Sequence, residues 1–167
     1  MTRREGLAGG LIGPAMRTES RIVELAAGQH GLVTRAQLLA SGLCRDAIRW
    51  SVRVGRLRPV QRGIYLVGPL EHPRMRERAA VLACGAGAVV SHRSAGHLWG
   101  VCEARGGPVE VSLPSGNRGR RPGVRPHRVR LRRDEVTALD GIPVTTPART
   151  ILDLAAQAGF REVEQAV

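Results

Sequence analysis

The sequence of 167 residues predicts an α+β fold in two parts, and three observations support this prediction. An early segment contains two short helix patterns, separated by a glycine turn, and then two β-prone runs. The later segment combines helix patterns with short strand patterns in mixed order. Pro69 and Pro73 lie between the two segments and argue against a continuous helix there. We therefore expect a winged helix-turn-helix at residues 18–68, followed by a small mixed α/β domain at residues 72–167.

Residues 1–17 are expected to form a disordered basic leader. They contain TRRE and the stretch LAGGLIGPA, whereas a signal peptide needs a longer apolar region with little glycine. No run in the sequence approaches the roughly 20 apolar residues of a transmembrane helix. The three cysteines, Cys44, Cys84 and Cys102, form no CxxC pair, which indicates reduced thiols and argues against structural zinc. We expect a cytoplasmic protein that uses neither a cofactor nor a metal.

Three helices are expected in the first part. The first covers the segment ESRIVELAAGQHG, which begins after Thr18. Thr34 and Gln37 have the spacing of a capping box for the second helix, and Gly42 is placed to end that helix in a left-handed conformation. Cys44 then occupies the N-cap of the third helix, where Ser or Asp would be a stronger cap.

The third helix is expected to carry its arginines on one side. At about 100° per residue, they fall within roughly 80° of one another on a helical wheel. The residues of this face are Arg45, Arg49, Arg53 and Arg56. A merely solvated helix usually mixes charges of both signs, and here only Asp46 is close by. The pattern therefore predicts a face that contacts DNA phosphates and guanine bases.

Two β-prone runs follow this helix and predict a wing. Residues 57–60 and 64–67 flank a short loop, in which Gly63 can adopt the positive φ of a hairpin. Pro59 restricts the first run to an edge strand. Arg62 at the tip would contact the DNA backbone or the minor groove. The complete predicted DNA-binding set is Arg35, Arg45, Arg49, Arg53, Arg56 and Arg62.

The composition favours a polyanionic partner. All 26 basic residues are arginine, and they outweigh the 14 acids to give a net charge of +12. The aromatic residues are Trp50, Tyr65, Trp99 and Phe160. These are too few for the stacking platforms that bind single strands or RNA. Double-stranded DNA is therefore the expected partner.

The second part is expected to alternate between helices and short strands. The expected helices cover Met75–Cys84, the segment from Ser91 to Gly100, a segment that starts after Thr146, and a last segment from about Arg161. The expected strands cover residues 88–90, 109–113, 124–131, 136–139 and 142–145. Thr146 and Pro147 form an N-cap followed by proline at the first helical position. We expect that helix to bury Ile151, Leu152 and Ala155.

Ser91, His92, Ser94 and His97 are the residues that would suggest nucleophilic catalysis. However, His92 and His97 diverge at their spacing on a helix, and no carboxylate lies near them in the sequence to orient an imidazole. Two histidines without acidic or cysteine neighbours also make a poor metal site. We expect Ser91 to cap its helix, the histidines to be partly buried, and the chain to contain no catalytic residue.

A second basic patch is predicted in the later segment. Strand alternation places Arg128, Arg130 and Arg132 on one face. Such a face would contact the DNA backbone without sequence preference, and a solvated basic loop has the same pattern. Asp134 and Glu135 form the only adjacent pair of acids, so the sequence shows no converging carboxylates for a two-metal nuclease.

The motif order from Glu19 to Val167 resembles the AbiEi-type antitoxins of type IV (abortive infection) toxin–antitoxin systems, in their actinobacterial form. The matching motifs are TRAQLLASGL, GRLRPVQRGIYLVG, HPRMRERAAVLACGAGAVVSHRSAGHLWG and DGIPVTTPARTILDLA. The resemblance implies a DNA-binding domain that represses its own operon at inverted repeats, joined to an α/β antitoxin domain. It also implies a nucleotidyltransferase-like toxin that the antitoxin opposes without a tight complex. Cys44 stands where the family usually has Ser.

Two functions stay open at this stage. The first is a DNA-binding repressor and antitoxin that catalyses no reaction. The second is the DNA-targeting portion of a larger restriction-endonuclease-like enzyme, because many relatives in the resembling family continue into such a domain. The last residues, EVEQAV, stop in mid-periodicity without a C-cap. We therefore expect the chain to be C-terminally truncated.

Overall fold

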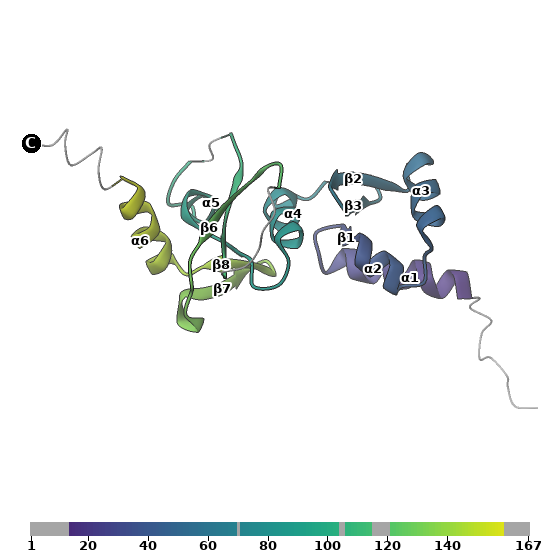
Figure 1. Ribbon diagram of the computed structural model, residues 1–167, viewed down its shortest axis with the longest axis horizontal. Helices are drawn as coiled ribbons and strands as arrows, with labels where there is room; N and C mark the ends of the chain where they lie inside the picture. The colour runs from purple at the N-terminus through teal and green to yellow at the C-terminus, as the bar shows by residue number, and fades with distance from the viewer. Residues whose placement is uncertain (1–13, 70, 104–105, 115–120, 159–167) are drawn as a thin grey trace, which may run out of the picture.

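The computed structural model describes residues 14–69, 71–103, 106–114 and 121–158. These residues form two β-sheets, each with its own helices, and one helix lies between the sheets (Figure 1). The predicted leader is covered only in part, because residues 1–13 lie outside the described ranges. Residues 14–17 belong to a helix, so the prediction that the first helix starts after Thr18 is wrong.

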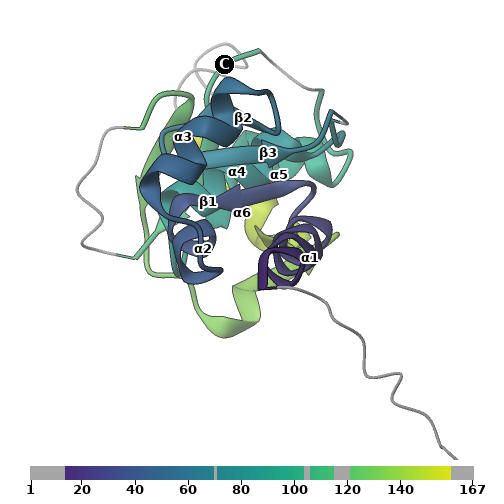
Figure 2. The same cartoon turned by 90° about the vertical axis from the view of Figure 1, so that its right-hand side faces the viewer.

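The N-terminal unit is a winged helix-turn-helix, as predicted. Its elements are α1 (Pro14–Ala27), β1 (Leu32–Thr34), α2 (Arg35–Ala40), α3 (Arg45–Arg53), β2 (Leu57–Gln61) and β3 (Ile64–Val67). The sheet is antiparallel in the order β1-β3-β2, with α4 behind it in the view of Figure 2. Pro59 lies in the edge strand β2, as predicted. The short strand β1, which pairs Leu32 with Leu66, was not predicted.

Local signals explain why α2 begins and ends where it does. The Thr34 N–H donates to Gln37 Oε1 at 2.8 Å, and the Gln37 N–H donates to Thr34 Oγ1 at 3.2 Å. This reciprocal capping box satisfies two backbone donors at the helix start. Gly42 follows the helix with φ of +100°, a conformation that only glycine adopts without strain. Both predictions are confirmed.

The C-terminal unit is a mixed sheet with helices around it. Its elements are α4 (Met75–Cys84), β4 (Val89–Val90), α5 (His92–Leu98), β5 (Val109–Leu113), β6 (Val124–Arg128), the 3-10 helix η1 (Arg133–Glu135), β7 (Val136–Leu139), β8 (Ile142–Thr145) and α6 (Pro147–Ala158). The strand order is β6-β5-β4-β8-β7, with parallel pairs β5/β6 and β4/β8. The predicted α+β class is confirmed. The predicted last helix, from about Arg161, lies outside the described residues.

Helix α4 packs against both sheets. Ala79 contacts the buried side chains of the winged sheet, which include Ile64 and Leu66. Ala80 and Cys84 pack into the core of the five-stranded sheet on the other side. Small side chains on both faces of the helix let the two sheets approach it closely. The division into domains at residues 68 and 72 stays a prediction, because α4 belongs to both cores.

Polar contacts join the same two units beside α4. The Nδ1 atoms of His30 and His72 lie 3.0 Å apart, and His30 Nε2 lies 2.7 Å from the Asp140 carbonyl oxygen. Arg74 also pairs with the Asp140 carboxylate, and Arg78 donates to the Gly141 carbonyl at 2.8 Å. The β7–β8 turn of the C-terminal unit is thereby linked to the loop that follows α1.

The face of α6 that packs inward differs from the predicted one. Ile151 and Leu152 are 54% and 66% exposed, whereas Thr150 and Asp153 are buried. Arg149 donates to Asp153 Oδ1 at 2.8 Å, and Thr150 Oγ1 donates to the backbone carbonyl of β8 at 3.2 Å. The expectation that Ile151, Leu152 and Ala155 are buried is therefore wrong. The inward face of this helix therefore includes polar side chains with specific partners.

Candidate nucleic-acid interface

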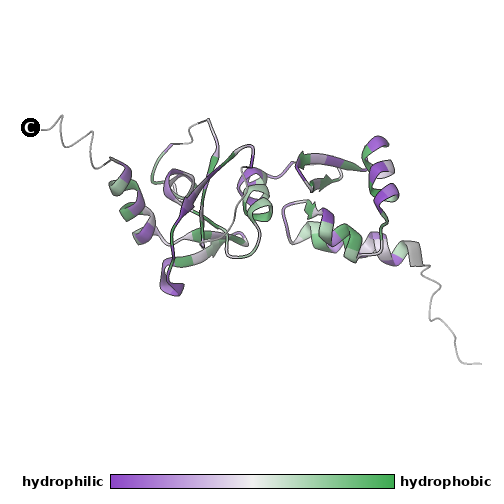
Figure 3. Cartoon of the chain, in the orientation of Figure 1, coloured by the Kyte–Doolittle hydropathy of each residue, from purple (hydrophilic) through white to green (hydrophobic). Residues whose placement is uncertain are grey.

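Burial of one side of α3 determines which side chains it exposes. Cys44 occupies the N-cap as predicted, and its Sγ accepts a hydrogen bond from the Ala47 N–H at 3.4 Å. Ile48 is buried in the core of the winged unit, and Val52 packs against the same core. The rest of the helix surface is largely hydrophilic, as the purple ribbon of α3 shows in Figure 3.

The outward side of α3 carries three exposed arginines, Arg45, Arg49 and Arg53. Arg49 forms an ion pair with Asp46, one helical turn earlier. Because both partners are exposed to solvent, this pair contributes little to stability. Arg49 is therefore available to bind another anion or a base.

The prediction that Arg56 belongs to the same helix face is wrong. Helix α3 ends at Arg53, and Gly55 has φ of +78°, so the chain leaves the helix before it reaches Arg56. The guanidinium carbon of Arg56 lies 5.2 Å from the Trp50 ring centroid, and its Nη1 lies 3.4 Å from Glu19 Oε1. Arg56 lines a separate, largely apolar hollow of about 720 Å³ between α1 and α3. A helical wheel places Arg56 with the others only if the helix continues past its real end.

The wing lies beside the arginine face of α3. Gly63 has φ of +77°, as predicted, and the pairing register shifts between Pro59 and Gln61. Arg62 is exposed at the tip. The Arg35 N–H donates to the Gly63 carbonyl at 2.7 Å, which ties the tip of the wing to the start of α2.

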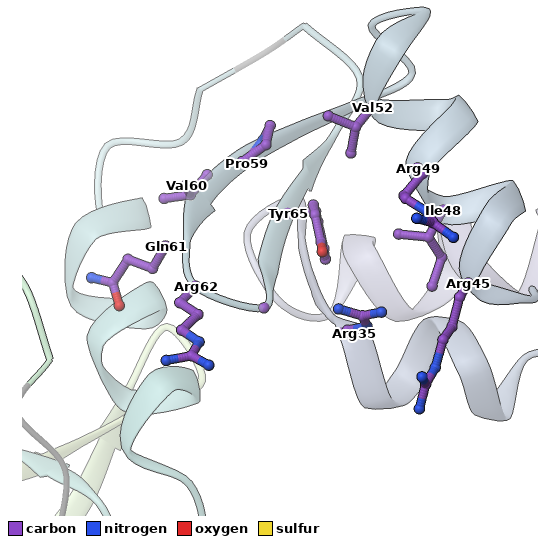
Figure 4. Close-up of a pocket in the computed structure, with 11 residues that line it drawn as sticks. Arg35, Arg45, Ile48, Arg49, Val52, Pro59, Val60, Gln61, Arg62 and Tyr65 are labelled. Carbon is purple, nitrogen blue, oxygen red and sulfur yellow. The ribbon is translucent and has the colours of Figure 1, made fainter.

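A cleft of about 460 Å³ lies between α3, the wing and the start of α2. Its charged lining residues are Arg35, Arg45, Arg49 and Arg62, with no acid among the described residues that line it. Figure 4 shows Tyr65 between the wing and α3, with Arg45 and Arg49 on the α3 side. Gathered guanidinium groups make this cleft attractive to a polyanion. Sequence reasoning missed Tyr65, because its strand pattern indicated only that it belongs to the wing.

The second basic patch extends beyond the strand that was predicted to carry it. Strand β6 ends at Arg128, so Arg130 and Arg132 follow the strand, but exposure still alternates, with Val129 and Leu131 half-buried between the exposed arginines. Arg132 makes a bidentate pair with Asp134, with both distances 3.0 Å. Arg128 and Arg130 are exposed. Only the predicted extent of the strand, to residue 131, is wrong, and whether these arginines contact DNA stays a prediction.

Ser91 and His92 belong to a buried polar cluster that sequence reasoning missed. Ser112 Oγ donates to Ser91 Oγ at 2.8 Å, and Ser91 Oγ lies 2.9 Å from His92 Nδ1. Ser91 is the N-cap residue of α5, as predicted, but its side chain makes no capping hydrogen bond. The ring of His92 stacks on His127 with 3.6 Å between centroids, and Asp153 Oδ2 lies 3.8 Å from His92 Nδ1. Because Ser91 is fully buried, its hydroxyl cannot meet a substrate.

The carboxylate of Glu110, in β5, also belongs to this cluster. Glu110 Oε2 accepts from the Arg93 N–H at 2.9 Å, and Glu110 Oε1 lies 3.3 Å from His127 Nε2. Burial alone would raise the pKa of Glu110, but these hydrogen bonds and one from Gln157 hold that pKa below its ordinary value. Burial lowers the pKa of His92, and the nearby His127 lowers it further. His97 is exposed on the same helix, so the two α5 histidines diverge as predicted.

We expect acid to destabilise the C-terminal unit through His92. Since the folded state holds the pKa of His92 below its ordinary value of 6.5, the unfolded chain takes up this proton first as the pH falls. The stability that depends on neutral His92 is complete above about pH 6.5 and is lost as the pH falls below it. Glu110 adds a further loss below its ordinary value of 4.5. Melting temperatures followed by circular dichroism from neutral to acid pH measure this decline.

Two glutamine variants test whether His92 causes this pH dependence of stability. His92→Gln should flatten the decline near pH 6, whereas His97→Gln, at an exposed position of the same helix, should leave it unchanged. If wild type and His92→Gln lose melting temperature in parallel between pH 7 and pH 5, the assignment to His92 is wrong.

The described residues contain neither a cluster of metal ligands nor a membrane-spanning helix. In those ranges, no group of three or more His, Cys, Asp and Glu side chains is arranged to hold a metal ion. None of the helices in the described part is long and apolar enough to cross a membrane.

A winged helix-turn-helix with an arginine-lined cleft is the architecture of a DNA-binding transcriptional regulator. A family model described as "Transcriptional regulator, AbiEi antitoxin" matches residues 20–68, and one described as "AbiEi antitoxin C-terminal domain" matches residues 80–164. The chain belongs to the AbiEi antitoxin family. The resemblance found in its motifs is thereby confirmed, and both parts of the chain match models of this antitoxin family.

Solved structures include one that is similar to this chain. The crystal structure of the RV2827C protein from Mycobacterium tuberculosis is 24% identical, with a TM-score of 0.43. The similarity covers 69% of this chain and 46% of that one, so the chain spans less than half the length of that protein. No curated protein matches the sequence.

Proposed function

We propose that this antitoxin represses its own operon by placing α3 in the major groove of duplex DNA, with the wing along the adjacent backbone. The observation that carries the proposal is the cleft between α3 and the wing, in which Arg35, Arg45, Arg49 and Arg62 gather with no acid in its described lining. Repression follows because a protein bound at inverted repeats in its promoter excludes RNA polymerase.

Within this interface the arginines have different roles. Arg45 and Arg49 lie toward the N-terminal end of α3, which enters the groove in helix-turn-helix proteins. We assign them to base edges, where a guanidinium binds guanine O6 and N7. Arg53 at the end of α3, Arg62 at the wing tip and Arg35 at the start of α2 hold phosphates, which position the protein without reading sequence.

The remaining basic residues have weaker support. Arg56 contacts Glu19 and Trp50 and stands outside the cleft, so we give it no base contact. Arg128 and Arg130 are exposed on the C-terminal unit and are proposed as non-specific phosphate contacts.

The antitoxin function is proposed to act through gene expression and not through catalysis. The cognate toxin would be a nucleotidyltransferase-like enzyme that this protein opposes without a tight complex. Ser91 and His92, the pair that would suggest a hydrolase, are buried in the polar cluster and serve to hold β5, α5 and α6 together. The chain is therefore proposed to act by binding alone.

Two measurements on purified protein test this function. The protein should shift its own promoter at nanomolar concentration in moderate salt, and should leave supercoiled plasmid intact with Mg²⁺ or Mn²⁺. Metal-dependent nicking that disappears when Asp134 or Asp140 is replaced would support a nuclease instead. Equal affinity for the promoter and for random duplex would contradict operator recognition.

Removing the charge at the wing tip should weaken binding to all duplexes alike. Because Arg62 is assigned to a phosphate, Arg62→Ala should lower the affinity for operator and random DNA by the same factor. It should also reduce the slope of log affinity against log salt concentration by about one. Fluorescence anisotropy at several salt concentrations measures both effects. Arg21→Ala removes the same charge from α1 and should leave the slope unchanged, and a slope reduced equally by both variants would refute the wing contact.

A further inference from the structure

Asp46 is the only acid of α3, and it stands among the arginines of the exposed face. Its side chain is 82% exposed, and that of its partner Arg49 is 75% exposed. The two side chains form an ion pair across one helical turn. A carboxylate on a surface that binds a polyanion opposes binding unless it meets a hydrogen-bond donor of the nucleic acid.

The fold itself does not explain this acid. Helix α3 is capped by Cys44, whose Sγ accepts from the Ala47 N–H. An exposed ion pair such as Asp46–Arg49 adds little stability. An acid in the first turn stabilises a helix through the helix dipole. However, an acid at another position of the first turn would do the same, so this effect does not explain why the acid lies beside Arg49.

The major groove limits what an exposed carboxylate can contact. Phosphates repel it, as do the acceptors guanine O6 and N7 and thymine O4. The donors in this groove are the amino groups of cytosine, N4, and adenine, N6. Adenine N6 lies between two acceptors, its own N7 and the paired thymine O4, whereas cytosine N4 has an acceptor on one side only, the paired guanine O6, and the C5–H of its own ring on the other.

We infer that Asp46 accepts a hydrogen bond from cytosine N4 and thereby sets base preference beside Arg49, an inference that rests on the proposed function. Arg49 binds a guanine and Asp46 binds a cytosine of the same or the adjacent base pair. In the free protein the two side chains pair with each other, and base contacts replace this exposed pair when DNA binds. Asp46 acts mainly against wrong sequences, because a guanine or thymine at its position faces it with acceptors.

The test is selection from a library of duplex DNA with a randomised central segment. Wild-type protein should select a motif that contains a strongly preferred cytosine. Asp46→Ala should keep the other positions and lose about tenfold of the discrimination at this one, which corresponds to about 1.4 kcal/mol. Asp46→Asn should move the preference from cytosine to adenine, because an asparagine amide pairs with adenine N6 and N7. Glu24→Ala removes the same charge from the exposed side of α1 and should select the wild-type motif.

The possible results distinguish a failure of this inference from a failure of the proposed function. If Asp46→Ala selects the wild-type motif unchanged, the inference is overturned and operator binding stands. If Glu24→Ala relaxes the same position equally, the effect belongs to net charge and the inference is also overturned. If wild-type protein selects no motif, the proposed function itself fails.

Discussion

Replacing Arg49 with alanine is expected to weaken operator binding by about 5- to 150-fold and to flatten the sequence preference of the protein. One bidentate contact between a guanidinium and guanine supplies roughly 1–3 kcal/mol of discrimination, and that energy converts to this range. Arg49 is exposed on the N-terminal half of α3 and lines the cleft beside Tyr65. Asp46, with which Arg49 forms its ion pair, is itself exposed, so the loss of the Arg49 side chain should not unfold the helix.

Affinities for the operator and for random duplex DNA, measured side by side, show whether Arg49 contacts a base or a phosphate. Affinity for random duplex should change far less than affinity for the operator, because only the operator presents the guanine. Arg53→Ala, from the same helix, should instead weaken both duplexes by a common factor. Equal losses on operator and random DNA for Arg49→Ala would show that it holds a phosphate and reads no base.

A second large effect is expected from Leu66→Ala in β3. Leu66 is fully buried in the core that joins the winged sheet to α4, together with Leu32 and Ala79. Removal of a buried leucine side chain leaves a cavity and destabilises a protein by about 2–5 kcal/mol. For a chain of this size the melting temperature falls by about 2–4 °C per kcal/mol. Thermal unfolding followed by circular dichroism measures the loss.

A matched leucine on the surface controls for the substitution itself. Leu39 on α2 is 40% exposed, so Leu39→Ala should cost much less than Leu66→Ala. Similar losses from both variants would contradict the packing of α4 against the winged sheet. Because that packing joins the two units, Leu66→Ala should also speed proteolysis near residue 70.

The winged helix could be predicted because its determinants are local. Each of its signals acts on the backbone only a few residues away. These signals are the capping box at Thr34 and Gln37, the left-handed Gly42 and the hairpin glycine Gly63. The boundaries of α4 were also read correctly from the sequence. The strand β1 was missed because its three residues become a strand only through pairing with β3, more than 30 positions later.

Two errors concern side-chain partners that the hydrophobic pattern does not show, and a third, at Arg56, concerns the local end of a helix. The inward face of α6 was misassigned because Thr150 donates to β8, and because Arg149 joins Asp153 to Glu135 of η1; apolar periodicity does not reveal these contacts. The cluster around His92 was missed because Glu110 and Asp153 are far from it in the sequence. Arg56 was misplaced because the helix end at Arg53 depends on the left-handed Gly55.

The candidate site was predicted better than its surroundings. Four of its arginines, Arg35, Arg45, Arg49 and Arg62, line one cleft. Helical spacing accounts for Arg45 and Arg49, and the hairpin tip accounts for Arg62. The participation of Tyr65 depends on how β3 faces α3, which is a tertiary relation and is not encoded in the strand pattern.

The most direct test of the central claim is a hydroxyl-radical footprint of the protein on its own promoter. If α3 enters the major groove at inverted repeats, protection should appear at two half-sites with centres about one helical turn apart. The footprint should vanish with Arg49→Ala at the same protein concentration. Uniform protection along the promoter, or protection that Arg49→Ala leaves unchanged, would contradict operator recognition by the arginine face of α3.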